Sequence, residues 1–396
     1  MILCLTNYNI VSTMNDMTSI IKPVKQFVAP AKILADYTNG TPGEPYDIKE
    51  LSAFVCDDSI PYEKRLLVFL DHPRFKKDDK FAVLYSNQCR NWYDLYTLMA
   101  CASYHVYFDT TYYCDLECRH CISDAGPKQP MNFMPVGDIT HYIEQAKTED
   151  VSVCHFALFG GEPIFAEIHN KGYFEQISKA VGDKKMAFST NGNWINGKHA
   201  DYLIGEIIKM YETIPKFLFQ ISVSRFHKNS VENAKKIIQK LDSNVHKPIN
   251  VNVHGFDFDM AEFKSQCDTL STNNVHVRLD FESGIVSGGR AATIPNKTSC
   301  DTDHDAKRAI IIGNKEIPGN ICFAVMKPCA FDGCNKMRIS LHFTPDGQAF
   351  TRDRLNPNKK YITPIKTRSG EYRTYSEIIQ SLSRQIFNNY KGEIER

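Results

Sequence analysis

The sequence predicts an α/β fold, a partial (β/α)6 TIM-like barrel over residues 105–290. Short apolar or β-branched runs alternate there with stretches of helical periodicity, which is typical of a parallel sheet covered by helices. In that architecture the functional side chains follow the carboxyl ends of the strands. The expected strands are 105–111, 153–159, 185–189, 217–223, 249–254 and 275–281. The expected helices are 136–146, 173–181, 200–211, 230–241 and 260–270.

The regular alternation covers only the middle of the chain. Residues 1–104 read as a mixed α/β extension without a motif. After residue 290 the rhythm is lost, and residues 291–396 are expected to form a smaller C-terminal domain. Within that segment, strands are expected at 309–312 and 338–343, and a helix at 375–390. The sequence therefore predicts three parts.

Composition limits the classes of function. The chain carries 47 basic and 46 acidic residues, a formal net charge of +1. This balance creates no overall field that would attract nucleic acid or an anionic membrane. No apolar run approaches the roughly 20 residues that cross a bilayer, and Met1–Met14 lacks the basic start of a signal peptide. We expect a cytoplasmic protein without nucleic-acid or membrane partners.

Three of the 13 cysteines, Cys114, Cys118 and Cys121, directly follow the first expected strand. A [4Fe–4S] cluster that is held by three thiolates keeps one iron open to a chelating ligand. A zinc knuckle is the alternative, but zinc prefers four ligands in a closed tetrahedral site. The spacing alone is compatible with both sites, and the family resemblance given next implies that these three cysteines are catalytic cluster ligands.

The pattern Cys-x3-Cys-x2-Cys after a first strand resembles the hallmark of the radical S-adenosylmethionine (SAM) superfamily. His120 fits the aromatic position before the third cysteine. The resemblance implies an enzyme whose [4Fe–4S] cluster takes an electron from a flavodoxin- or ferredoxin-type donor. SAM is then cleaved reductively, and a 5′-deoxyadenosyl radical abstracts hydrogen from a substrate C–H bond.

Three later strand ends resemble motifs that bind SAM in this superfamily. The stretch 160–163, Gly-Gly-Glu-Pro, resembles the motif that binds the methionine amino group, and 189–192 resembles a motif whose side chains hydrogen-bond SAM. Taken alone, each is also an ordinary turn. Ser222 is a candidate for the ribose, while Arg225 either pairs with a carboxylate or lies at the surface. The predicted cofactor-binding residues are His120, Gly160, Gly161, Glu162, Pro163, Ser189, Asn191, Ser222 and Arg225.

Side chains further along the expected barrel alternate in polarity. Asn252 and His254 share one face of the fifth expected strand, and Arg278 and Asp280 share one face of the sixth. If that face is the barrel interior, they line the pocket. For His254, a hydrogen-bonded core histidine is an equal alternative.

The C-terminal cysteines are the main ambiguity of the sequence. The stretch 288–291, Gly-Gly-Arg-Ala, and the cysteines after it resemble the passage into a SPASM or twitch domain, which would hold an auxiliary [4Fe–4S] cluster. The usual Cys-x2-Cys pair is lacking, so buried packing cysteines are the alternative. The candidate ligands are Cys300, Cys322, Cys329 and Cys334. The remaining cysteines that stand alone, which we expect to pack, are Cys4, Cys56, Cys89, Cys101, Cys154 and Cys267.

The resemblance favours a ribosomally made peptide as substrate, modified by a cross-link, an epimerisation or an oxidation. The extension 1–104 would then hold a leader peptide. The alternative substrate is a small metabolite such as a sugar, nucleoside or amino acid. A non-catalytic iron–sulfur or zinc protein is a hypothesis of another class, and it predicts that Glu162 and Asn191 are replaceable.

Overall fold

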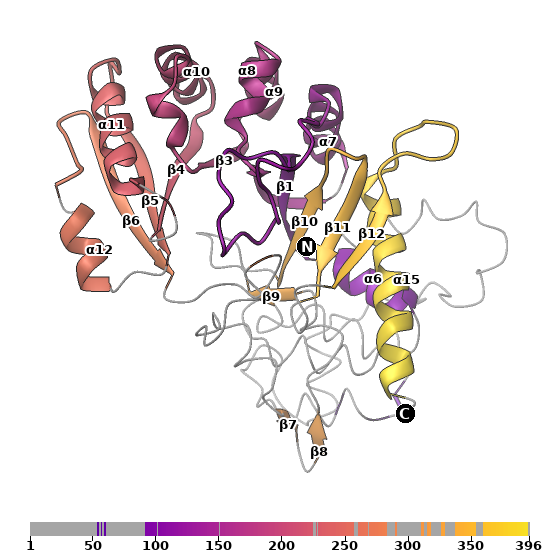
Figure 1. Ribbon diagram of the computed structural model, residues 1–396. Helices are drawn as coiled ribbons and strands as arrows, with labels where there is room; N and C mark the ends of the chain where they lie inside the picture. Colours follow the sequence, from indigo (N-terminus) through magenta and orange to yellow (C-terminus); the bar gives the residue numbers. More distant parts are fainter. Residues whose placement is uncertain are drawn as a thin grey trace. The chain divides into compact units, whose positions relative to one another are not determined.

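Figure 1 shows a computed structural model of the chain, which falls into two compact units. The larger unit comprises Tyr104–Asp305 and Ser340–Leu382, and the other comprises Met1–Ser103, Ala306–Ile339 and Ser383–Arg396. Within these ranges the structure describes residues 54, 57, 59–60, 92–100, 102–149, 151–224, 227, 229–256, 260–267, 269–282, 290, 310–312, 315–317, 326–328, 337–353 and 359–394.

A twisted sheet organises the larger unit, and its neighbouring strands follow the order β12-β11-β10-β1-β2-β3-β4-β5-β6. Strands β2 to β6 pair in parallel. The mixed α/β class with a large parallel sheet, predicted from the sequence, is therefore confirmed. The first six strands are β1 (Ser103–Thr111), β2 (Ser152–Gly160), β3 (Lys185–Thr190), β4 (Lys216–Ser224), β5 (Ile249–Phe256) and β6 (Val275–Glu282).

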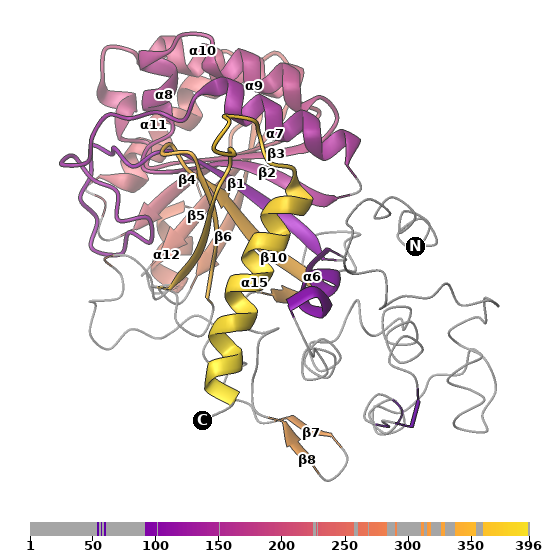
Figure 2. The ribbon, with the colours of Figure 1, turned by 90° about the vertical axis from the view of Figure 1, so that its right-hand side faces the viewer.

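Helices lie between consecutive strands and pack on one side of the sheet (Figures 1 and 2). In α11 the apolar residues Ala234, Ile237, Ile238 and Leu241 are buried, because the 3.6-residue period places them on one stripe. Two short helical segments, α8 and η3, were not expected from the sequence. The helices are α7 (Val136–Thr148), α8 (Ile164–His169), α9 (Tyr173–Val181), η3 (Asn193–Asn196), α10 (Ala200–Thr213), α11 (Ser230–Asp242) and α12 (Met260–Cys267).

Three antiparallel strands extend the sheet beyond β1. They are β10 (Met337–Phe343), β11 (Gln348–Arg352) and β12 (Lys360–Pro364). Gly347, at φ +74°, completes the turn between β10 and β11, where its missing Cβ permits the left-handed backbone. Part of the segment after residue 290 therefore shares a sheet with the core. The boundaries at 104 and 290 and the SPASM-like domain stay predictions.

Tyrosine side chains fasten this extension to α7. The hydroxyl of Tyr142 donates to the carbonyls of Ile365 and Arg373 at 2.9 and 3.0 Å. Tyr375, at the start of α15 (Tyr375–Ile394), donates to the carbonyl of Tyr142 at 3.1 Å. Both phenols are buried, so these bonds satisfy groups that would otherwise be costly inside the core.

The other unit contains short elements. They are α6 (Trp92–Ala100), the antiparallel pair β7 (Ile310–Ile312) and β8 (Lys315–Ile317), and β9 (Met326–Pro328), which pairs with the first residues of β10. The Arg384 guanidinium stacks over the Trp92 ring at 4.0 Å. Among the described helices of the whole chain, none is both long and apolar enough to cross a membrane.

Candidate active site

The cysteine loop begins where β1 ends and returns to the same place. The backbone N–H of Gly126 donates to the carbonyl of Tyr112 at 3.1 Å, and that of Cys114 donates to the carbonyl of Gly126 at 3.3 Å. Cys114 is buried, whereas Cys118 and Cys121 are half-buried. The two backbone bonds therefore fix the loop, defined here as residues 114–126, at the carboxyl end of β1.

Backbone donors point at two of the three thiols. The N–H of Leu116 lies 3.5 Å from the sulfur of Cys114, and that of Ala125 lies 3.3 Å from the sulfur of Cys121. Burial raises the pKa of Cys114, with the nearby Glu162 adding to it, and burial and the Cys121 charge raise that of Cys118 to about 12. A reactive free cysteine needs a lowered pKa, whereas a metal deprotonates its ligand outright. These thiols therefore fit metal ligands better than nucleophiles.

The donor set also fits a cluster better than one ion. Among the described residues, no three His, Cys, Asp or Glu side chains converge as ligands of a single metal ion. The three thiolates of a cluster bind three different irons and need not meet at one point, whereas zinc ligands do. N–H bonds to sulfur are among the contacts that tune such clusters.

The two glycines of the Gly-Gly-Glu-Pro stretch let β2 approach the start of the cysteine loop. A Cβ on Gly161 would lie 2.1 Å from the carbonyl oxygen of Tyr113, and one on Gly160, at φ +106°, would lie 2.5 Å from that of Thr111. The N–H of Gly161 donates to the Thr111 carbonyl at 2.6 Å, and the N–H of Glu162 donates to the Tyr113 carbonyl at 3.0 Å. At both glycines the closely approaching group is protein backbone, and their contact with SAM stays a prediction.

Glu162 joins the end of β2 to the end of β3. Its carboxylate accepts bonds from the Thr190 hydroxyl at 2.8 Å, the Asn191 N–H at 2.8 Å and the Ile164 N–H at 3.3 Å. The side chain is 1% exposed, and burial raises its pKa to about 8. A carboxylate has about four acceptor positions. Three protein donors leave one position for a ligand group, and Glu162 already acts as a structural anchor.

Asn191 closes the arrangement. Its side-chain amide lies 3.5 Å from the sulfur of Cys114 and 3.0 Å from a carboxylate oxygen of Asp115. The amide of Asn193 donates to the other oxygen of Asp115. The motifs after β1, β2 and β3 thus form one hydrogen-bonded cluster around Cys114.

Arg290 was not among the predicted site residues, yet it holds the cysteine loop from outside. Its backbone N–H donates to the carbonyl of Cys121 and its Nε to that of Cys118, both at 3.0 Å. Its guanidinium also binds the Ala125 carbonyl and the Asp124 carboxylate, the latter at 2.9 Å. The stretch 288–291 was interpreted only as a passage between domains. The sequence signal that could have identified Arg290 is an arginine, with its five hydrogen-bond donors, in a segment expected to be a loop.

A polar row crosses the sheet on the face opposite the helices. Asn252 donates to Gln220 at 3.1 Å and to Asp280 at 2.8 Å, and Gln220 donates to Ser189 at 3.2 Å. Asn252 is buried, and its amide oxygen has no hydrogen-bond partner among the described residues. Ser189 and Asn252 are therefore joined through Gln220, which the sequence analysis did not select.

Two residues further along β4 and β5, Ser222 and His254 are register partners, and His254 is also the register partner of Asp280 on β6; all three are half-buried. His120 faces His227, with ring centroids 5.1 Å apart, and burial lowers the pKa of His120 to about 4. That imidazole is therefore neutral at physiological pH. The roles of His120, Ser222 and His254 toward SAM stay predictions.

Several predicted residues lie outside the described part of the chain. They are Arg225, Cys300, Cys322, Cys329 and Cys334, together with Cys4, Cys56, Cys89 and Cys101. Of the remaining cysteines, Cys267 is buried and Cys154 is half-buried on β2. Pro163 precedes α8 at φ −61°, a backbone angle that the proline ring favours.

No protein-family model and no curated protein matches the sequence. Among solved structures, native anSMEcpe with bound AdoMet is similar at 13% identity and a TM-score of 0.41, over 72% of this chain and 82% of that chain. Streptococcus suis SuiB bound to S-adenosylmethionine is similar at 13% identity and a TM-score of 0.37, over 79% of this chain and 77% of that chain. Escherichia coli coproporphyrinogen III oxidase (HemN), a radical SAM enzyme, is similar at 10% identity and a TM-score of 0.33, over 66% of this chain and 70% of that chain. The fold described above rests on the strand order of the chain itself.

Proposed function

We propose that this protein is a radical SAM enzyme that modifies a peptide side chain. The observation that carries the proposal is the meeting of three separate motifs at Cys114. Asn191, from the end of β3, contacts the Cys114 sulfur, and Glu162, from the end of β2, binds the backbone of Asn191. These motifs are 77 and 29 residues apart in sequence, so their meeting is a property of the fold.

Cys114, Cys118 and Cys121 would hold the cluster, which together with SAM supplies a carbon radical that can take hydrogen from an unactivated C–H bond. The side chains of the protein hold the reacting groups in fixed positions. Arg290 fixes the backbone of the cysteine loop, and Asp115 is held between Asn191 and Asn193. The half-buried side chains of Ser222, His254 and Asp280 would meet SAM. A rigid frame matters because a radical of this kind attacks the nearest bond.

The test is an iron and acid-labile sulfide count after anaerobic reconstitution, followed by reduction with dithionite in the presence of SAM. About four irons assign one cluster to the triad, and about eight add an auxiliary cluster. Formation of 5′-deoxyadenosine and methionine is the expected reaction. A chain that binds zinc in place of iron, or iron without cleaving SAM, contradicts the proposal.

Glu162→Gln is the sharpest variant for this reaction. The change keeps the size of the side chain but replaces one of its acceptor oxygens with an amide and removes the charge that the carboxyl carries above its pKa of about 8, so we expect weaker SAM binding in equilibrium dialysis with the cluster retained. Glu167→Gln is a matched control, because Glu167 is also fully buried and accepts backbone bonds, from Gly172 and Phe174. Equal losses of SAM affinity in the two variants would show that Glu162 has only a structural role.

A further inference from the structure

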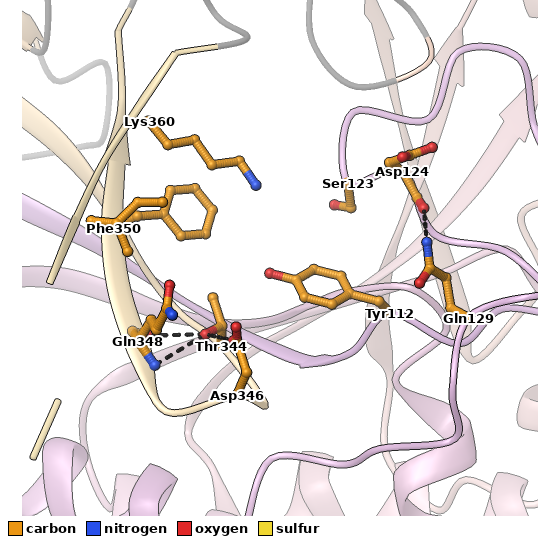
Figure 3. A pocket seen from close by; sticks show the side chains of 10 residues that line it. Tyr112, Ser123, Asp124, Gln129, Thr344, Asp346, Gln348, Phe350 and Lys360 are labelled. Atoms are coloured by element: carbon orange, nitrogen blue, oxygen red, sulfur yellow. Dashed lines mark hydrogen bonds between the residues drawn. The ribbon is translucent and has the colours of Figure 1, made fainter. Parts of the chain in front are cut away.

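A pocket lies beside the cysteine loop, between it and strands β10 to β12 (Figure 3). Its volume is about 320 Å³. This is near the lower end of the ~300–1,000 Å³ range of small-molecule sites, so it suits one side chain or one small molecule. The lining residues are Tyr112, Ser123, Asp124, Gln129, Thr344, Asp346, Gln348, Phe350, Lys360 and Ile362.

Lys360 is the cation of this pocket. Its ammonium lies 4.5 Å from the centroid of the Phe350 ring, and it makes no hydrogen bond or ion pair with any described residue. The side chain is half-buried, and burial, followed by repulsion from Arg352, lowers its pKa. An ammonium that is partly desolvated and has no direct ion pair gains free energy from an anionic ligand, in addition to the longer-range attraction of Asp109, Asp346 and Asp124.

A stack of rings holds Lys360 in place. Tyr107 stacks on His342 at 4.7 Å between centroids, and His342 stacks on Phe350 at 4.6 Å. His342 is buried and its Nδ1 lies 3.1 Å from the carboxylate of Asp109. Lys360 then covers the exposed end of the stack. The cation is therefore preorganised, which lowers the entropy cost of binding.

The other wall offers hydroxyl groups. In Figure 3 the Tyr112 hydroxyl points across the pocket toward Lys360 and Phe350, and Ser123 is drawn above the Tyr112 ring. Asp124 pairs with Arg290, and Asp346 accepts a bond from Thr344. These two carboxylates repel a singly charged ligand less than a dianion such as phosphate, and Lys360 with the Ser123 hydroxyl would bind that single charge. The Tyr112 hydroxyl also bonds to Asp109.

The rim is apolar. Among the described residues, the large hydrophobic side chains that are exposed are Met131, at 53%, and Ile362, at 42%. Ile362 lines the pocket, and Asn132, next to Met131, donates to the carbonyl of Pro345 in the β10–β11 turn at 3.5 Å. Exposed apolar side chains around a polar pocket are typical of a binding surface for another chain.

We propose that this pocket binds the side-chain carboxylate of an acidic residue in a peptide, with apolar residues of that peptide on Met131 and Ile362. Ser123 lies two residues after Cys121, so the peptide would be held against the cysteine loop. The assignment of this peptide as the substrate rests on the proposed function. The assignment of the pocket as a carboxylate site does not depend on the proposed function.

The experiment measures how peptides protect Lys360 from acetylation by limiting acetic anhydride, with mass spectrometry of the labelled peptides. The probes are acetyl-Leu-Glu-Leu-amide and acetyl-Leu-Gln-Leu-amide, which differ only in the carboxylate. We expect the acidic peptide to protect Lys360 at a concentration about tenfold lower than its neutral partner. Lys359, whose ammonium lies over the Tyr361 ring outside the pocket, should label equally throughout.

Equal protection by the two peptides, or none, overturns the carboxylate site. Protection by free glutarate as strong as by the acidic peptide overturns the peptide assignment. Ser123→Ala, which removes one hydroxyl and leaves Lys359 labelling as an internal check of the fold, should reduce the tenfold difference. Labelling needs neither SAM nor turnover, so a protein that fails to bind iron but still protects Lys360 contradicts only the proposed function.

Discussion

The carboxyl ends of β1–β3 and those of β4–β6 are built differently. At the first three strands Glu162 and Thr190 are buried, at 1% and 3% exposed, and are bonded to each other. At the next three, Ser222, His254 and Asp280 are half-buried, and Arg278 is exposed. The buried groups of the first half stabilise the strand ends, whereas the half-buried groups of the second half keep part of their surface open to solvent. The difference agrees with the proposed function, in which a preformed cluster site would lie beside a surface that takes up a ligand.

The largest effect is expected at the triad. Cys114→Ser should reduce iron after reconstitution to background, because only two thiolates remain. Cys154→Ser, on β2, should keep the full iron content. The measurement is iron and sulfide per chain. Equal iron in both variants would remove the cluster from the first half of the site.

Next comes the contact of β2 with the cysteine loop. Gly161→Ala should lower the free energy of unfolding by about 3 kcal/mol, since the new methyl meets backbone. Gly255→Ala, on β5, would meet the Phe263 ring at 2.7 Å, and a side chain can shift, so we expect about 1 kcal/mol. Denaturant midpoints of both variants check the ranking. A larger loss at Gly255 would reverse the comparison.

Removing one hydroxyl from each half of the site tests the difference between β1–β3 and β4–β6 without adding bulk. Thr190→Val should cost about 2 kcal/mol, because the hydroxyl donates to Glu162 and accepts from the Trp194 indole N–H at 2.9 Å. Ser222→Ala should stay within about 0.5 kcal/mol in stability. If Ser222 meets SAM, its loss appears in SAM affinity alone. Chemical unfolding and SAM dialysis, run side by side, separate the two results.

The smallest expected change in stability concerns two arginines. Arg290→Met removes side-chain bonds to the cysteine loop and should cost about 1.5 kcal/mol. Arg278→Met removes only an exposed pair with Asp280 at 3.4 Å and should cost nothing measurable. The rate of iron loss to a chelator should rise for Arg290→Met alone. Equal rates would show that Arg290 does not support the loop.

Local patterns predicted the parallel strands well, because each is a short apolar run followed by a helix of clear period. They also placed Cys114, Glu162 and Asn191 at strand ends. The roles of the two glycines could not be predicted, since the group they approach is backbone 48 or more residues away in sequence. Arg290 was missed, and so was the place of the predicted strand 338–343 beside β1, because their partners are distant and no local pattern encodes a distant pairing. Strands β11 and β12 were not predicted.

The cysteine loop is fastened from two places that lie far along the chain. Arg290 binds the carbonyl of Cys118 across 172 residues, and Arg352 binds that of Ile122 across 230 residues at 3.0 Å. On the ribosome, both arginines leave the exit tunnel long after the loop does. Contacts of such separation form late. We therefore expect a nascent chain whose cysteines stay accessible to iron–sulfur delivery until the C-terminal hairpin docks and locks them.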